Sequence, residues 1–149
     1  MHFSTLPRSH LTHAVWFSRR RLGLAAIGLA CGLVGCTPTG ADGDSVSLDV
    51  ARTELEAGRM VLIDIREPAE HATGVAQGAQ LLPMRQLGER LAEIPTDPGK
   101  PVLLICATKN RSSATLEALR AKGYKHVRYV QGGMSEWNRR GWPLVKPQF

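Results

Sequence analysis

Short apolar runs alternate with helix-like segments from Val46 onward. The runs Val61–Ile65, Val102–Ile105 and Val127–Val130 have the length and aliphatic content of buried parallel strands. Helices are predicted over Ser47–Gly58, Leu87–Ile94 and Ser112–Gly123, and a last short helix after the turn Gly132-Gly133. This alternation predicts an α/β fold, in which a central parallel sheet is covered by helices on both faces.

Local signals add detail to these segments. Ser47 or Asp49 can cap the first helix and Gly58 can end it, while Leu116 and Leu119 should face the core from the helix that follows Cys106. The stretch GVAQGAQLLP predicts a turn and then a short extended piece. The stretch PTDPGKP predicts a loop, because proline and glycine dominate it.

The first 35 residues have a different composition. They contain four arginines, no lysine and none of the 13 acidic residues of the chain. Arg19, Arg20 and Arg21 precede an apolar stretch, Leu22–Gly35, whose 14 residues would span about 21 Å as a helix, less than the ~30 Å bilayer core. We therefore predict a signal peptide over residues 1–35 rather than a transmembrane helix. The weak likeness of SRRRL to a twin-arginine signal leaves the export route open.

The end of this leader resembles the processing site of bacterial lipoproteins. The motif LVGC places an apolar and a small residue before Cys36, which would be lipidated and become the new N-terminus. The small polar residues up to Ser45 predict a flexible tether over residues 36–45, and the domain then covers residues 46–149. The expected location is the bacterial cell envelope, lipid-anchored and facing the periplasm or exterior. A plain signal peptide is the alternative, and the choice between inner and outer membrane stays open.

The charge balance argues against nucleic-acid binding. The whole chain has a formal net charge of +6, but from residue 36 onward 15 basic residues stand against the 13 acidic ones. The excess positive charge therefore belongs mainly to the leader. Nucleic-acid binding needs a basic stripe on a folded face, which this distribution does not provide.

The loop after the second apolar run carries the candidate chemistry. If Cys36 is acylated and Cys31 is removed with the leader, Cys106 is the one thiol left and has no partner for an intramolecular disulfide. Cys106 lies where a strand meets a helix N-terminus, whose dipole and free N–H groups favour the thiolate, as do Lys109 and Arg111. Such a loop pairs a nucleophile with an anion site. The alternative is a small apolar residue that ends a buried strand.

Three motifs together resemble one family. Cysteine-dependent phosphatases separate cysteine and arginine by five residues, whereas here four residues separate Cys106 from Arg111, and the shorter loop suits an added sulfur atom better than a tetrahedral oxyanion. The loop CATKNRS resembles that of single-domain rhodanese-type sulfurtransferases. Two flanking segments resemble further motifs of that family, through Asp64, Arg66, Glu67, Gly74, Gly78, Ala79 and Pro83 and through Gly132, Gly133, Trp137, Gly141, Trp142 and Pro143.

The resemblance implies a rhodanese-like fold and a thiosulfate sulfurtransferase activity. Cys106 would take the outer sulfur of a donor such as thiosulfate as a persulfide, and a thiol or cyanide would then remove it. Lys109 and Arg111 would bind the anionic donor, and the backbone N–H groups of the loop would hold the persulfide. The loop residues assigned to substrate binding are Ala107, Thr108, Lys109, Asn110, Arg111 and Ser112. No metal or organic cofactor is implied, and we expect a monomer.

Two other functions remain open. The first is a rhodanese-like sulfur-carrier or protein-interaction module with little turnover. The second is a small thiol enzyme similar to arsenate reductases, although that chemistry requires a longer loop or a second, resolving cysteine. The sequence names neither the physiological donor nor the acceptor.

Some residues receive structural predictions. Asp64 and Arg66 lie at the end of the first apolar run, where one of them could brace the cysteine loop, or where they could form an ordinary surface pair. The family often has glycine where Lys109 stands, so lysine predicts either backbone strain or a different loop shape.

The remaining aromatic and histidine residues suggest no site. Trp137 lies at helical spacing and is expected in the core. His71 and His126 are expected at the surface or partly buried, and no metal site is predicted around them.

Overall fold

A five-stranded sheet forms the centre of the molecule. The computed structural model describes residues 43–147, so the predictions on the leader, on Cys36 and on most of the tether lie outside the described residues. All neighbouring strands pair in parallel, in the order β1-β5-β4-β2-β3, which makes β4 the middle strand. The strands are β1 (Ser45–Val46), β2 (Val61–Asp64), β3 (Gln80–Leu81), β4 (Val102–Ile105) and β5 (Val127–Val130).

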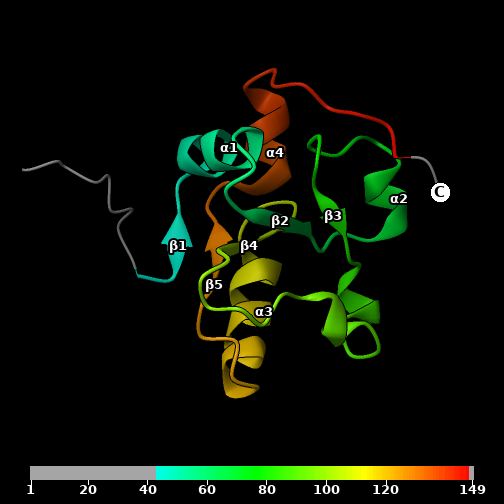
Figure 1. Cartoon of the computed structure of the whole chain (residues 1–149). Helices are drawn as coiled ribbons and strands as arrows, with labels where there is room; N and C mark the ends of the chain where they lie inside the picture. The colour runs from blue at the N-terminus through cyan, green and yellow to red at the C-terminus, as the bar shows by residue number, and fades with distance from the viewer. Residues whose placement is uncertain (1–42, 148–149) are drawn as a thin grey trace, which may run out of the picture. The chain divides into compact units, whose positions relative to one another are not determined.

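Helices cover both faces of this sheet, as the alternation of elements predicted. In Figure 1, α1 and α4 lie on one side of the sheet and α3 lies on the other. The helices are α1 (Leu48–Glu56), α2 (Pro68–His71), α3 (Asn110–Ala121) and α4 (Gly133–Arg139), with 3₁₀ turns η1 (Met84–Gln86) and η2 (Leu91–Glu93). The predicted α/β arrangement, a central parallel sheet with helices on both faces, is therefore confirmed.

Residues of β4 alternate between the two halves of the core. Leu103 and Ile105 pack in the cluster that contains the buried residues of α1 and α4. Leu104 and Cys106 pack in the opposite cluster, with Leu116 of α3. Successive side chains of a strand point to opposite faces of the sheet. Because both faces of β4 are buried, the strand needs the continuous apolar run that it has. The side chain of Cys106, the first residue after β4, thus packs on the α3 side of the core.

Several local predictions are confirmed. The side chain of Ser47 caps α1 by accepting from Val50 N at 3.4 Å, and Gly58 follows the helix with φ 66°. Leu116 and Leu119 are buried on α3. The strands β4 and β5 have the predicted bounds, and β3 is the predicted short extended piece.

The predicted helix over Leu87–Ile94 is wrong. This segment forms a turn and then the three-residue 3₁₀ turn η2. Leu87 and Ile94 are buried as the spacing suggested, but Gly88 interrupts the segment and disfavours helix. Eight residues are also too few to sustain an α-helix without strong packing.

The short elements that were not predicted include α2 and β1, besides the 3₁₀ turn η1. The helix α2 begins after Glu67 with Pro68 in its first turn, a position that suits proline, and Glu67 N donates to Glu70 Oε2 at 3.0 Å. The strand β1 includes Ser45, the last residue of the predicted tether, which is fully buried against β5.

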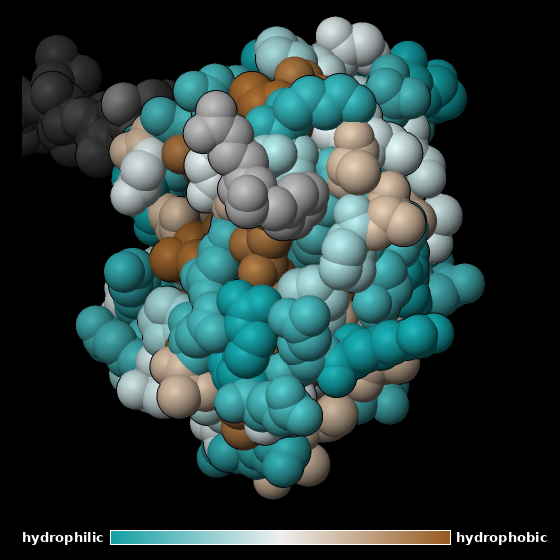
Figure 2. Space-filling model, turned by 90° about the vertical axis from the view of Figure 1, so that its right-hand side faces the viewer, coloured by the Kyte–Doolittle hydropathy of each residue, from teal (hydrophilic) through white to brown (hydrophobic). Residues whose placement is uncertain are grey.

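The surface of the described part is mostly polar. Figure 2 shows a largely hydrophilic face with small, separate apolar patches. Among large apolar residues between positions 43 and 147, only Met84 and Val145 are clearly exposed. Over the same residues, no helix combines the length and hydropathy that crossing a bilayer requires.

Candidate active site

Cys106 lies at the carboxyl end of the middle strand, where ligands bind in parallel α/β sheets. The residue is 1% exposed. Its carbonyl oxygen accepts a hydrogen bond from Met134 N at 2.8 Å, and the next carbonyl, that of Ala107, accepts from Ser135 N at 2.8 Å. The first amides of α4 therefore hold the start of the cysteine loop.

Gly133 of α4 packs directly against three carbonyl oxygens of the cysteine loop. A Cβ at this position would lie 2.5 Å from Cys106 O and 2.6 Å from Ala107 O, and closer still to Thr108 O. Three successive carbonyl oxygens thus point toward Gly133. In a trans peptide the N–H points opposite to the C=O, so the N–H groups of residues 107–109 point away from α4.

The N-terminus of α3 adds further free donors. The first helical amide with an intrahelical acceptor is Ser113 N, which donates to Lys109 O at 2.9 Å. The preceding amides of residues 110–112 belong to the unpaired set at every helix start. The loop from Ala107 to Ser112 therefore offers a run of N–H groups, which can hold an anion or an ionised sulfur.

Lys109 occupies this loop without left-handed backbone strain. Its φ is −140°, so the predicted conflict between lysine and a positive φ is resolved by a different loop shape. The side chains of Thr108, Lys109 and Asn110 are exposed at the surface of the loop. Lys109 is therefore free to meet a charged group in solvent.

Ser112 is the polar side chain nearest the thiol. Cys106 Sγ donates to Ser112 Oγ at 3.5 Å, and the serine hydroxyl donates to Lys109 O at 3.0 Å. Ser112 is fully buried. A hydroxyl can rotate, so the same serine can donate to the sulfur once the thiol is ionised.

Arg111 is engaged by a carboxylate. Its two terminal nitrogens donate to Glu70 of α2 at 2.6 and 2.7 Å, in a bidentate pair. The pair holds the pKa of Glu70 at about 2, below its usual 4.5, mainly through the hydrogen bonds from Arg111. Arg111 was predicted to bind the anionic donor together with Lys109, and in the structure its guanidinium group is paired with Glu70.

Asp64 and Arg66 form a buried pair rather than a surface pair. Arg66 Nη2 donates to Asp64 Oδ2 at 2.6 Å, and the two side chains are 7% and 0% exposed. Arg66 also donates to Gly74 O at 2.8 Å and to Glu70 O at 3.3 Å. The hydrogen bonds of the Arg66 side chain go to residues 64–74 rather than to the cysteine loop, so the pair acts on the site by positioning Glu70.

His71 completes this buried cluster. The ring is 1% exposed, so the prediction of a surface or partly buried histidine is wrong here. Its Nε2 lies 3.5 Å from Asp64 Oδ1. His126 is partly buried as predicted, with Nε2 2.8 Å from Pro95 O. Trp137 is in the core as predicted, and its indole N–H donates to Pro143 O at 3.1 Å.

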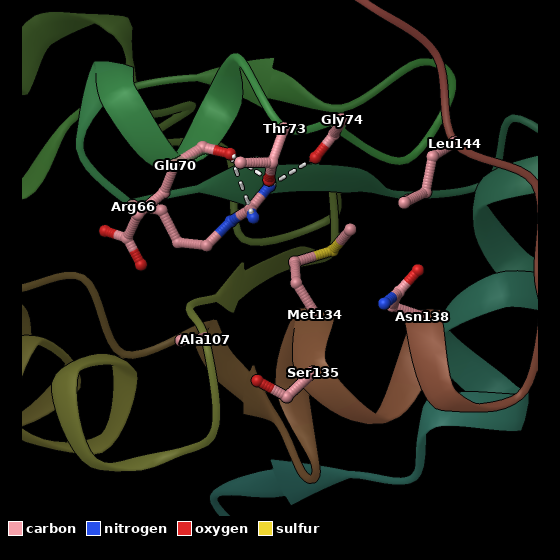
Figure 3. Close-up of a pocket in the computed structure, with 9 residues that line it drawn as sticks. All are labelled: Arg66, Glu70, Thr73, Gly74, Ala107, Met134, Ser135, Asn138 and Leu144. Carbon is pink, nitrogen blue, oxygen red and sulfur yellow. Dashed lines mark hydrogen bonds between the residues drawn. The ribbon is translucent and has the colours of Figure 1, made fainter.

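A pocket of about 270 Å³ opens beside the cysteine loop. In Figure 3, the side chains of Met134 and Asn138 project into it from α4, and Leu144 faces them from the C-terminal segment. Its lining residues are Arg66, Glu70, Thr73, Gly74, Ala107, Met134, Ser135, Asn138 and Leu144. The loop, α2, α4 and the C-terminal segment thus converge on one space next to Cys106.

Sequence reasoning missed Glu70 and the residues of α4 that line this pocket. The signal for Glu70 was present in the pattern Glu67-Pro68-x-Glu70, because proline and an acidic residue are favoured in a helical first turn. No local signal marks Met134, Ser135 and Asn138, because α4 and the cysteine loop are brought together only by the parallel pairing of β4 and β5.

The Glu70–Arg111 pair leads to a prediction about stability and pH. Glu70→Gln should lower the free energy of unfolding by about 1 kcal/mol at pH 7, a value discounted for solvent screening because both side chains are about one third exposed. The pKa of Glu70 is lowered in the folded state, so the contribution is complete above 4.5 and is lost as the pH falls toward about 2.

Denaturant unfolding of both proteins at pH 7 and pH 2.5 checks this prediction. The exposed pair Arg90–Glu93 offers a control, since Glu93→Gln removes the same charge far along the chain and should have a smaller effect. If the difference in free energy of unfolding between the wild type and Glu70→Gln stays constant down to pH 2.5, the stabilising role assigned to the Glu70–Arg111 pair is wrong.

Together, these features define an α/β domain in which a buried cysteine lies on a loop rich in free amides. Residues 47–140 match the family described as Rhodanese-like domain, and the chain belongs to that family. It is therefore a member of a sulfurtransferase family.

Relatives support this placement. The chain is 37% identical over 107 residues to a sulfurtransferase of Allochromatium vinosum, covering 72% of this chain and 94% of that protein. It is 40% identical over 86 residues to the uncharacterized protein YqhL of Bacillus subtilis, covering 56% of this chain and 67% of that one.

Solved structures agree on the fold. A rhodanese-related protein from Thermoplasma volcanium superposes with a TM-score of 0.61 at 28% identity, covering 69% of this chain and 98% of that chain. A thiosulfate sulfurtransferase from Pseudomonas aeruginosa superposes with a TM-score of 0.61 at 27% identity, covering 70% of this chain but 20% of that one. The match therefore spans about a fifth of the latter chain.

Proposed function

We propose that the protein transfers sulfane sulfur from a donor such as thiosulfate to a thiophilic acceptor through a Cys106 persulfide. The Cys106 thiolate attacks the outer sulfur of thiosulfate, the S–S bond of the donor breaks, and sulfite leaves with the electron pair. Cyanide or a thiol then attacks the outer sulfur of the persulfide, which releases the Cys106 thiolate again. Neither transfer step is a net oxidation or reduction, so no external oxidant or reductant is required.

The orientation of the loop peptides carries this proposal. Carbonyls of residues 106–108 point toward Gly133, which leaves the amides of residues 107–109 on the opposite side, together with those at the start of α3. An ionised persulfide extends the side chain by one sulfur atom and needs donors around it. Backbone amides at fixed positions stabilise such a charge without reorganising.

Intact mass spectrometry tests this function. The full-length protein in mild detergent should gain one sulfur atom after incubation with thiosulfate and lose it after cyanide. A digest should place the added sulfur on the peptide that contains Cys106. If neither thiosulfate nor a thiol persulfide adds sulfur to Cys106, the proposal is wrong.

A sulfur carrier with little turnover is the second candidate, and the burial of the thiol favours it. Cys106 is 1% exposed, so donor access requires some opening of the loop, which limits the rate. A carrier would acquire one sulfur per chain but would release little thiocyanate under excess thiosulfate and cyanide. Multiple turnovers per minute would instead support the enzyme.

Lys109→Ala should raise the KM for thiosulfate about two- to fivefold at low ionic strength, because an exposed cation steers the anionic donor. The effect should shrink at high salt, where the Debye length is short. Steady-state kinetics at two salt concentrations measure it. Lys122→Ala, an exposed lysine at the other end of α3, is the control. Equal effects of the two variants would show that Lys109 does not serve the site.

We further propose that the protein is anchored to the bacterial envelope by lipid on Cys36, as a monomer that faces the periplasm or exterior. The motif LVGC and the polar residues after it support this location. One acyl chain anchors only weakly, so stable attachment relies on the several chains that lipoprotein processing supplies.

Cys36→Ala should therefore abolish both fatty-acid labelling and membrane association. Metabolic labelling and cell fractionation provide the measurement, and Cys31→Ala is the matched control that should keep both. A Cys36→Ala protein that remains membrane-bound at an unchanged size would mean that the leader is an uncleaved anchor. A freely soluble wild type would mean a plain signal peptide.

A further inference from the structure

Basic residues recur at the end of the sheet where the strands begin. Arg59, Lys100 and Lys125 each lie two residues before a strand, namely β2, β4 and β5. The first residues of these three strands are partners in the parallel ladder, and neighbouring strands lie about 4.8 Å apart. The three basic residues therefore precede their strands in the same register. We call this end of the sheet the amino edge, and its loops comprise residues 57–60, 95–101 and 122–126.

Lysines give the amino edge an unbalanced positive charge. Lys100, Lys122 and Lys125 are exposed there and are three of the five lysines of the chain. Within residues 43–147, no ion pair is found for any of these three lysines. In the loops that carry them, the carboxylate is that of Asp97, which accepts from Gly99 N at 2.8 Å. The two loops together are therefore positively charged.

A small pocket opens between these two loops. His126 Nε2 lies 2.8 Å from Pro95 O, a contact that joins the loops 95–101 and 122–126. The pocket has a volume of about 150 Å³, the share of about five water molecules at roughly 30 Å³ each. Its lining residues are Thr96, Lys122, Gly123, Tyr124 and His126. Because a phosphate group has five heavy atoms, the pocket has room for one beside Lys122.

The chain enters the domain close to the amino edge. Asp44, the residue before β1, pairs with Arg120 in the last turn of α3 at 2.6 Å. Seven residues lie between Cys36 and Asp44, and seven residues extend to at most about 25 Å. A domain of about 100 residues has a radius of gyration of about 13 Å, so such a tether is too short to lead round it to the opposite edge. A lipid on Cys36 would therefore keep the amino edge, rather than the edge with Cys106, toward the membrane.

We propose that the amino edge rests on an anionic lipid surface, where Lys100, Lys122 and Lys125 meet lipid phosphates and one headgroup phosphate occupies the small pocket. This inference rests on the proposed lipid anchor on Cys36. A lysine close to an anionic leaflet strengthens association roughly fivefold, because it lies in the negative surface potential. Acyl chains and a basic patch act together in stable membrane attachment. The entry point of the tether and the unbalanced lysines thus select the same face of the domain.

This orientation leaves the cysteine loop open to solvent. Cys106 follows the carboxyl end of β4, whereas Lys100 precedes the amino end of the same strand. The four residues of β4 alone span about 13 Å. The surface potential of a membrane falls off within a Debye length of about 8 Å at physiological salt. Anionic lipids would therefore not repel an anionic donor from the cysteine loop.

Hydrogen–deuterium exchange tests this contact on the full-length protein, purified from membranes and reconstituted in lipid vesicles. One set of vesicles is phosphatidylcholine alone, and the other contains about one third anionic phosphatidylglycerol. Peptides from the loops 95–101 and 122–126 should exchange at least about threefold more slowly on the anionic vesicles, because lipid contact restricts their opening. The difference should vanish at about 0.5 M salt, where the screening length is short.

A charge-reversal variant tests the lysines themselves. The combined variant Lys100→Glu, Lys122→Glu and Lys125→Glu should lose the slower exchange on anionic vesicles. Equal exchange of the wild type on both kinds of vesicle, or slower exchange that this variant retains, would overturn the proposal. If inorganic phosphate alone slowed exchange of the same loops on neutral vesicles, the pocket would belong to a free anion, and the membrane assignment would be wrong.

The control variant combines Arg85→Glu, Arg139→Glu and Lys146→Glu. These three residues are exposed and lie outside the amino edge, so the control has the same net charge and should keep the slower exchange. Failure of the lipid anchor would look different. Neutral vesicles would then not retain the protein, whereas anionic vesicles would still bind it and slow exchange in the two loops.

Discussion

Replacing Cys106 with serine should lower sulfur transfer at least about a thousandfold and leave the fold intact. A serine hydroxyl has nearly the shape of a thiol but is not ionised near neutral pH, so it cannot displace sulfite or a thiolate from a donor. The site offers serine a partner, because Ser112 Oγ lies 3.5 Å from the sulfur and can share a hydrogen bond with the new hydroxyl. The loss should therefore be chemical rather than structural.

The measurement combines a thiosulfate–cyanide assay with circular dichroism and thermal unfolding. Cys36→Ser is the matched control, since it makes the same substitution at the proposed lipidation site and should keep transfer in detergent-solubilised protein. Transfer by Cys106→Ser above about one tenth of the wild-type rate would rule out Cys106 as the nucleophile. A cooperative unfolding transition close to that of the wild type is required for the comparison to be valid.

Gly133→Ala should destabilise the protein by about 3 kcal/mol or more and should also disrupt transfer. Two causes act together. The residue has φ 61°, which disfavours any side chain, and a Cβ would lie 2.5 Å from Cys106 O and 2.6 Å from Ala107 O. Backbone oxygens cannot swing aside as a flexible side chain can, so α4 would have to move away from the cysteine loop.

Gly58→Ala separates these two causes. Gly58 has a similar φ of 66°, but no atom lies within 4 Å of the position that its Cβ would take. Gly58→Ala should lower the free energy of unfolding by about 1 kcal/mol, the cost of the backbone conformation alone, and should leave sulfur transfer unchanged. Denaturant unfolding and the transfer assay on both variants give the comparison. Equal losses of stability would show that the close approach of α4 to the loop does not matter.

The position of Cys106 in the fold could be predicted from the sequence, because it depends on local order along the chain. A four-residue apolar run predicts β4, and the residue directly after that run must lie at the carboxyl end of the strand. The helix after Cys106 could also be predicted from local sequence, because Leu116 and Leu119 repeat at helical spacing. Local signals were less reliable for Leu87–Ile94, where apolar spacing was right but Gly88 prevented an α-helix.

Long-range pairing decided which residues surround the cysteine loop. Arg111 was predicted to bind the anionic donor, but its bidentate partner Glu70, which lies 41 residues earlier in the chain, was not predicted. Asp64 was open to a surface role, yet the sheet buries it completely between neighbouring strands and makes Arg66 its partner. Charges can be counted in a sequence, but whether two of them meet depends on folding.

Hydrophobic period and order along the chain were therefore enough to predict the α/β fold class and to place Cys106 on a loop between β4 and α3. The tertiary structure alone decided the electrostatic balance and shape of the site. Parallel pairing of β4 with β2 and β5 brings α2 and α4 to the cysteine loop from opposite directions in sequence. Glu70, Gly133 and Met134 meet the cysteine loop only across that assembled edge, and no local pattern encodes a contact between segments so far apart.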